Sequence, residues 1–190
     1  MMTKNILIVG VGGQGTLLAS KVMGKVFLDS GYDVKVSEVH GMSQRGGSVV
    51  TYVRYGDEVY STLIDKGEAD ILLSFEALEA ARWLPYLKKD GVVITNTQRL
   101  NPMSVVMEKA TYPDDILEKI KAAGVNPVEA DALALKTPGS AKSVNVVLLG
   151  IAAKHIGLDK QLWLDAVKST VPPKTVDMNV AAFEKGYELN

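Results

Sequence analysis

The 190-residue sequence contains no cysteine and only two histidines. Without cysteine the chain can form no disulfide, present no thiolate nucleophile and ligate no iron–sulfur cluster. His40 and His155 are too few for a histidine-rich metal site, and no nucleophile or metal partner accompanies His40 in the sequence. These absences exclude a cysteine-ligated or histidine-rich metal site, and we name no catalytic residue and no metal ligand in this chain.

The sequence also lacks an excess of charge of either sign and any long apolar run. It has 21 basic and 22 acidic residues, so nothing in the overall charge favours nucleic acid as a partner. Its longest apolar run, residues 144–153, is too short to span a bilayer, and no basic leader precedes the first apolar segment. We expect a single cytoplasmic domain with no membrane partner.

Alternating apolar segments and turns predict an α/β domain. A short β-branched strand over residues 5–9, a glycine turn, a helix over 16–30 ended by Gly31, and a strand over 33–38 open the chain like a doubly wound sheet. Residues 48–55 and 59–63 read as a β-hairpin around a Gly-Asp turn. We therefore predict a three-layer, Rossmann-like, mostly parallel sheet with a β-hairpin insertion.

The rest of the chain continues this alternation. Apolar runs predict strands over residues 71–75, 92–96 and 125–130. Helical spacing predicts helices over residues 76–87, 113–123, 142–155, 158–169 and 175–187. Residues 102–112 fit either a strand or a loop.

The first turn carries a G-x-G-x-x-G pattern, which is typical of dinucleotide-binding turns. The turn comprises Gly10, Gly12, Gly13, Gln14 and Gly15. Glu38 ends the second predicted strand at about the spacing, ~20 residues, of an acid that holds a ribose hydroxyl. The alternative is that the glycines only permit a close crossing of strand and helix.

A second polar segment follows the second predicted strand and contains Ser43, Gln44, Arg45, Gly46 and Gly47. An arginine fork binds carboxylate or phosphate, and paired glycines let a backbone approach a ligand or another chain. We predict that the first two strands are neighbours, so that both loops meet at the carboxyl edge of the sheet. The alternative is an ordinary solvated loop.

Asn145 lies on an apolar face of a predicted helix, where a buried amide needs a hydrogen-bond partner. It either contacts a ligand or forms a hydrogen bond within the core.

Five segments together resemble the gamma-type domain of 2-oxoacid:ferredoxin oxidoreductases. The segments are GVGGQG, SEVHGMSQRGGSV, NTQ, AKSVNVVLLG and VPPKTVDMNVAAFEKGYEL. The resemblance runs from about Lys4 to Leu189, so we expect one gamma-type domain over residues 1–190, and it is strongest to the small-subunit branch of the indolepyruvate enzymes. The EVHGMSQRGG block is its specific part, because a glycine turn alone occurs in many folds.

The resemblance implies an accessory subunit of an enzyme that oxidatively decarboxylates a 2-oxoacid to an acyl-CoA and reduces ferredoxin. Thiamine diphosphate, Mg²⁺ and 4Fe–4S clusters would belong to a large alpha subunit, and coenzyme A would be a substrate. The isolated chain would be inactive and could form a homodimer. Alternatives are a gamma subunit of a pyruvate, 2-oxoglutarate or 2-oxoisovalerate enzyme, a stand-alone NAD(P)- or flavin-binding protein, and a nucleotide sensor. The glycine turn would contact coenzyme A phosphate, another nucleotide or the partner.

Overall fold

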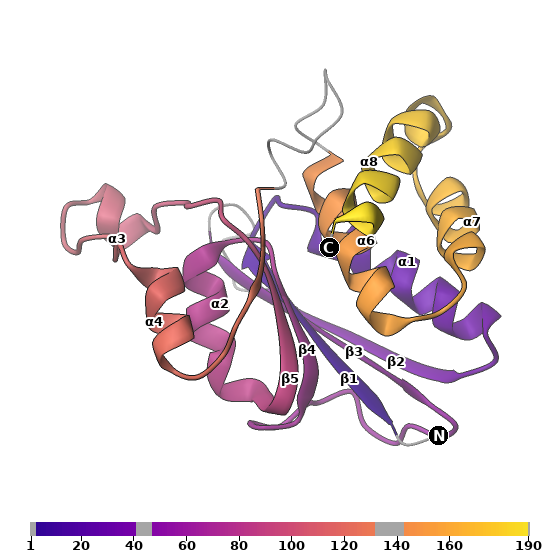
Figure 1. Cartoon of the computed structure of the whole chain (residues 1–190), viewed down its shortest axis with the longest axis horizontal. Helices are drawn as coiled ribbons and strands as arrows, with labels where there is room; N and C mark the ends of the chain where they lie inside the picture. Colours follow the sequence, from indigo (N-terminus) through magenta and orange to yellow (C-terminus); the bar gives the residue numbers. More distant parts are fainter. Residues whose placement is uncertain (1–2, 41–46, 132–142, 190) are drawn as a thin grey trace.

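The computed structural model describes residues 3–40, 47–131 and 143–189, and Figure 1 shows how their helices and strands are arranged. The strands are β1 (Lys4–Val11), β2 (Asp33–His40), β3 (Ser48–Gly56), β4 (Ala69–Ser74), β5 (Leu87–Asn96) and β6 (Val128–Ala130). The helices are α1 (Thr16–Asp29), α2 (Ala77–Trp83), α3 (Met103–Val106), α4 (Ile116–Ala122), α6 (Val144–Ile156), α7 (Lys160–Thr170) and α8 (Val176–Glu188). Short 3-10 helices occupy Leu84–Tyr86 and Pro173–Thr175.

The strands form one mixed sheet between two helical layers, which confirms the predicted single α/β domain. Its order is β2-β3-β1-β4-β5-β6. Among these six strands only β3 runs against the others, since it pairs antiparallel with both of its neighbours. Helices α1, α6, α7 and α8 cover one face, and α2 and α4 cover the other (Figure 1). A sheet buried on both faces explains why β1 is almost continuously apolar.

The predicted β-hairpin is wrong in its second strand. Residues 59–63 form no strand, because β3 is already paired on both sides by β1 and β2. The segment is held instead by the N–H of Val59, which donates to the Asp33 carboxylate at 2.8 Å. The antiparallel pair in this region is β2 with β3, in a register that places Glu38 opposite Thr51.

The same pairing overturns the prediction that the first two strands are neighbours. β3 lies between β1 and β2, so β2 is the edge strand of the sheet. β1 and β2 nevertheless run in the same direction, because each is antiparallel to β3. Their carboxyl ends therefore still meet at one edge of the sheet, together with the start of β3.

Several elements differ from the sequence prediction in their bounds. The helix expected to reach residue 87 ends at Trp83, because Pro85 restricts the residue before it and cannot donate a backbone hydrogen bond. β5 then begins at Leu87 rather than at residue 92. Residues 102–112, expected to be strand or loop, contain the short helix α3.

Glycines allow α6 and α8 to cross closely on one face of the sheet. A Cβ on Gly150 would overlap the carbonyl oxygen of Phe183, and a Cβ on Gly186 would overlap that of Val147. The backbones therefore touch with no side chain between them. This crossing fixes α8 against α6, and Phe183 is fully buried beside it.

Tyr55 gives the fold a pH dependence that can be measured. Its ring stacks on Phe27 with centroids 3.8 Å apart, and burial, with Tyr32 and Asp70 nearby, raises the pKa of Tyr55 to about 12. An unfolded tyrosine ionises near pH ~10, so the folded state retains this proton longer. This contribution to stability is complete below pH ~10 and is lost as pH rises towards about 12. The free energy of unfolding, measured with urea, should therefore fall less steeply with pH over that range for Tyr55→Phe than for the wild type. An equal pH dependence of the two proteins would show that Tyr55 does not cause it.

Candidate functional site

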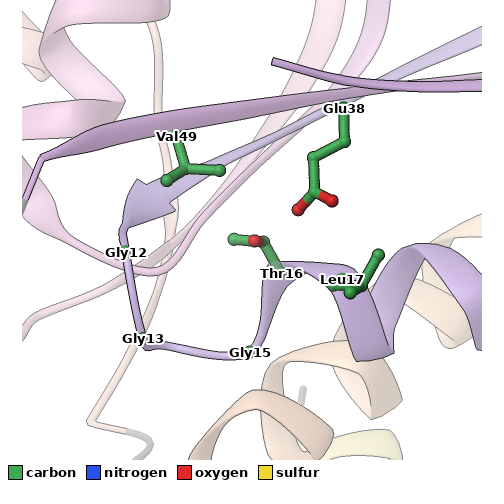
Figure 2. Close-up of a pocket in the computed structure, with 7 residues that line it drawn as sticks. All are labelled: Gly12, Gly13, Gly15, Thr16, Leu17, Glu38 and Val49. Atoms are coloured by element: carbon green, nitrogen blue, oxygen red, sulfur yellow. The ribbon is translucent and has the colours of Figure 1, made fainter. Parts of the chain in front are cut away.

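A pocket of about 370 Å³ opens where the glycine turn, the start of α1 and the two strands β2 and β3 meet. Its lining comprises Gly12, Gly13, Gly15, Thr16, Leu17, Glu38 and Val49 (Figure 2). The volume is within the range of small-molecule sites. The pocket lies at the carboxyl edge of the parallel strands, where folds of this class bind ligands.

Two glycines of the turn adopt left-handed backbone conformations. Gly13 has φ 100° and Gly15 has φ 89°, and Gly15 is the N-cap of α1. A Cβ on Gly15 would also overlap Nδ2 of Asn145, whereas one on Gly13 would meet open space. Gly15 is therefore required both by its φ and by its neighbour.

The start of α1 presents unsatisfied backbone donors to this pocket. Gly15 provides no side-chain cap, and the first turn contains no acidic residue. The Gly15 carbonyl accepts from Leu18 and Ala19, while in the described part of the chain the N–H groups of Thr16 and Leu17 have no backbone acceptor. A long helix with free N–H groups and a positive dipole end favours an anion such as phosphate.

Gln14, predicted as a ligand contact, is directed into the protein. Its Oε1 accepts from the N–H of Val11 at 2.7 Å, and its Nε2 donates to the Phe75 carbonyl at 2.9 Å and to Gln98 Oε1 at 3.2 Å. Gly10 has no room for a side chain, because Gln14 Oε1 and the Phe75 Cβ lie close to it. Both residues thus shape the turn by joining it to the end of β4.

The structure brings the glycine turn and the end of the second predicted loop together. The N–H of Gly12 donates to the Gly47 carbonyl at 2.9 Å. Next along the chain, the Ser48 hydroxyl donates to the buried Glu79 carboxylate at 2.6 Å. The remaining predicted residues of that loop, which are Ser43, Gln44, Arg45 and Gly46, lie outside the described residues.

Asn145 lies in the first turn of α6, directly against Gly15. It is 6% exposed, and its Nδ2 donates to the Gly15 carbonyl at 3.4 Å. Among the described residues its Oδ1 has no hydrogen-bond partner. Asn145 therefore supports the glycine turn from the α6 side, which agrees with the core hydrogen bond that the sequence left open.

Glu38 and Thr16 face each other across the pocket. Figure 2 shows the Glu38 carboxylate pointing from β2 towards the first turn of α1, and the Thr16 side chain pointing from α1 into the same pocket. The sequence analysis identified Glu38 but missed Thr16, Leu17 and Val49. A hydroxyl directly after the last glycine of the turn was the available signal for Thr16.

The described residues contain no group of three or more His, Cys, Asp or Glu side chains arranged to hold a metal ion. No helix within the described ranges is long and apolar enough to cross a membrane. The chemistry visible in this part of the chain is therefore that of backbone donors, one hydroxyl and one carboxylate around the pocket.

The fold and the glycine turn define a Rossmann-like α/β domain whose first helix begins without a capping side chain. A sequence model of the pyruvate ferredoxin/flavodoxin oxidoreductase family matches residues 5–189. The chain belongs to this family.

Relatives with curated names support this assignment along the whole chain. The indolepyruvate oxidoreductase subunit IorB of Thermococcus kodakarensis is 44% identical over 99% of this chain and 96% of its own length. The subunit of the same name from Methanothermobacter thermautotrophicus is 38% identical over 98% of this chain and 97% of its own length.

Solved structures show the same fold. The gamma subunit of a keto/oxoacid ferredoxin oxidoreductase from Geobacter sulfurreducens matches 97% of this chain and 96% of its own, with a TM-score of 0.71 and 24% identity. A 2-oxoglutarate:ferredoxin oxidoreductase from Magnetococcus marinus matches 98% of this chain with a TM-score of 0.76 and 18% identity. This chain corresponds to 31% of that longer polypeptide, so the fold also occurs as one part of a larger chain.

Proposed function

We propose that this chain is the small subunit of a cytoplasmic indolepyruvate:ferredoxin oxidoreductase. The complex would oxidatively decarboxylate aryl pyruvates to aryl-acyl-CoA and transfer two electrons to ferredoxin. The observation that carries the proposal is 44% identity to a subunit of that name over 99% of the chain.

The residues of this chain support a division of labour with a large alpha subunit. The sequence has no cysteine to ligate an iron–sulfur cluster. The described residues offer no cluster of metal ligands for the Mg²⁺ of thiamine diphosphate. The clusters, thiamine diphosphate and Mg²⁺ are therefore assigned to the alpha subunit, and ferredoxin is reduced through the assembled complex.

An exposed apolar groove beside the edge strand supports assembly with that partner. Leu17 and Leu28 of α1 and Val36 of β2 line it together and are 46%, 60% and 43% exposed. Exposed apolar patches of this kind mark protein interfaces. In the absence of the alpha subunit the same groove would favour a homodimer.

The second candidate is a gamma subunit for pyruvate, 2-oxoglutarate or 2-oxoisovalerate. It is favoured by the relationship to the pyruvate/ketoisovalerate oxidoreductase common subunit gamma of Pyrococcus abyssi, which is 27% identical over 94% of this chain. The higher identity to the indolepyruvate subunits favours the first candidate. A stand-alone NAD(P)- or flavin-dependent enzyme is the candidate of another class, and it rests on the glycine turn with Glu38.

Anaerobic reconstitution tests the proposal. The chain and its alpha subunit are mixed with indolepyruvate and coenzyme A, and viologen or ferredoxin reduction is followed, with pyruvate and 2-oxoglutarate as competing substrates. We expect turnover only in the mixture and fastest with indolepyruvate. Preference for another 2-oxoacid would support the second candidate, and NAD- or flavin-linked turnover by the chain alone would refute the subunit role.

Introducing a charged side chain into the groove tests whether this surface binds the alpha subunit. Leu28→Lys should weaken binding of the alpha subunit about tenfold or more, because a desolvated charge at an interface is unfavourable. Tyr60→Lys is the control, since Tyr60 is 86% exposed and lies outside the groove. Equal affinities for the two variants in a titration with labelled alpha subunit would place the interface elsewhere.

A further inference from the structure

We infer that β2 pairs with an extended segment of the alpha subunit, which joins the six-stranded sheet as an additional edge strand. The segment places apolar side chains in the groove between α1 and β2 and carries acidic side chains beside Lys21. The inference rests on the proposed function and deepens it, because it states how the groove is occupied and which chemistry the partner segment has.

β2 is a long edge strand with one side open. It has eight residues, and within the described part of the chain it pairs with β3 alone. The strand at the opposite edge, β6, has only three residues. A long open edge is a template for pairing with another chain, and proteins usually shorten or cover such edges. β2 is therefore the edge at which this sheet can be extended.

The ladder between β1 and β3 shows to which side each residue of β3 directs its backbone groups. The N–H of Gly12 donates to the Gly47 carbonyl at 2.9 Å, in the register of this ladder. The N–H of Asn5, which lies opposite Arg54, donates instead to the Asp70 carboxylate. Because bonded and non-bonded pairs alternate in an antiparallel ladder, the odd-numbered residues of β3 bond to β1. Its even-numbered residues bond to β2.

This alternation identifies the backbone groups of β2 that point out of the sheet. The residues of β2 opposite the even-numbered residues of β3 include Lys35, Ser37 and Val39. The N–H and C=O groups of Val34 and Val36 therefore point outward. No hydrogen bond between described residues involves either of these N–H groups. They are the groups with which an added strand pairs.

Apolar side chains are exposed on both faces of β2. Val36 faces α1 and is 43% exposed, whereas Val39 lies on the opposite face and is 51% exposed. A helix lying in the groove would cover Val36 and leave Val39 in water. A strand paired with β2 places side chains next to both, because its residues alternate between the two faces. This exposure favours a strand as the occupant.

The charges of the groove indicate the chemistry of that strand. Two lysines and one aspartate line it, and Lys25 pairs with Asp29 at 3.0 Å, so Lys21 is the excess charge among the described lining residues. Leu17 and Leu28, towards the two ends of α1, are large apolar contacts. Complementary charges stabilise an encounter and fix its register. The segment that fits is apolar on the groove side and has a net negative charge.

A second copy of this chain fits the same edge less well. If β2 pairs with β2 of a second copy about a twofold axis, the α1 helices of both copies lie on the same face of the joined sheet. The two Lys21 side chains would then share one groove, and like charges oppose the contact. The homodimer expected of the isolated chain is therefore the weaker assembly, and the partner strand displaces it.

Hydrogen exchange of the full chain, with and without its alpha subunit, tests the inference at single residues. In the isolated chain the amides of Lys35, Ser37 and Val39 should exchange slowly, because β3 accepts from them. The amides of Val34 and Val36 should exchange fast. In the complex their exchange should slow at least about tenfold and approach that of their neighbours. A helix bound in the groove would leave the alternation unchanged.

Val36→Pro removes one outward N–H without removing a bond to β3. Proline is tolerated in an edge strand where its missing N–H faces solvent, so the sheet should stay intact. Slow exchange at Lys35 and Ser37 in the variant confirms that it does. Binding of the alpha subunit should nevertheless weaken at least about tenfold, because the added strand loses a donor and meets the proline ring.

Lys21→Glu tests the charge of the partner strand. It should weaken binding of the alpha subunit about tenfold at low salt, and by less at high salt, where charges are screened. Lys119→Glu is the matched control, because it makes the same change in α4, on the other face of the sheet (Figure 1). It should alter the affinity little.

Three results would overturn the inference and leave the subunit function intact. They are unchanged exchange at Val34 and Val36 in an active complex, full affinity of a folded Val36→Pro, and equal affinities of Lys21→Glu and Lys119→Glu. Turnover by the chain alone, with no alpha subunit bound, would instead refute the subunit function and with it the inference.

Discussion

Replacing Gly150 with alanine is expected to lower the free energy of unfolding by about 3 kcal/mol. The added methyl group would overlap the Phe183 carbonyl oxygen and press on the Tyr187 N–H, both of them backbone groups of α8. Backbone cannot rotate away as the end of a flexible side chain can, so the two helices must separate. Their separation would open a space around Phe183, which is fully buried.

Gly24→Ala is the matched control for this prediction, because Gly24 is also a buried glycine within a helix. A Cβ there would lie 3.8 Å from Val36 Cγ2, which is an ordinary contact. Alanine should therefore stabilise α1 by up to about 1 kcal/mol through its helix propensity. Urea unfolding of the two variants should give changes of opposite sign, and a neutral Gly150→Ala would show that the crossing is looser than described.

Replacing Gly15 with alanine is expected to destabilise the protein by about 2 to 4 kcal/mol. Two causes act together, the left-handed φ of 89° and the overlap of the new Cβ with Asn145 Nδ2. Gly13→Ala separates them, since Gly13 has φ 100° and open space around its Cβ position. It should lose only the energy of backbone strain, about 1 to 2 kcal/mol.

A double-mutant cycle with Asn145→Ala isolates the overlap. Asn145→Ala alone should have a small effect, because it removes one hydrogen bond of 3.4 Å together with a carbonyl oxygen unpartnered among the described residues. In that background Gly15→Ala should be less destabilising by about 1 kcal/mol or more. Additive free energies would show that φ alone makes Gly15 necessary.

Most of the fold could be predicted from local sequence patterns, because most elements depend on local causes. The helix that follows the glycine turn ends where Gly31, with φ 84°, allows the chain to reverse. The apolar run of β1 identified a strand buried on both faces. The order of strands in the sheet depends instead on pairing between distant segments. Nothing in the sequence of β2 or β3 alone indicates that β3 lies between β2 and β1.

The candidate site was predictable only in part, for the same reason. The glycines and Glu38 follow known motif spacing, and the structure places both in one pocket. Gln14 is polar and next to the turn, yet its amide is used by Val11, Phe75 and Gln98, the last two far along the chain. The function of a polar side chain near a motif thus depends on contacts that only the folded chain provides.

The contact between Gly15 and Asn145 also has a consequence for synthesis on the ribosome. A growing chain releases Gly15 long before Asn145, and α8, which packs against Gly150, emerges later than both. Contacts between such distant parts of a chain slow folding. The glycine turn is therefore made well before the helices that complete it, and nascent chains that lack α6 and α8 expose an incompletely supported turn to chaperones and proteases.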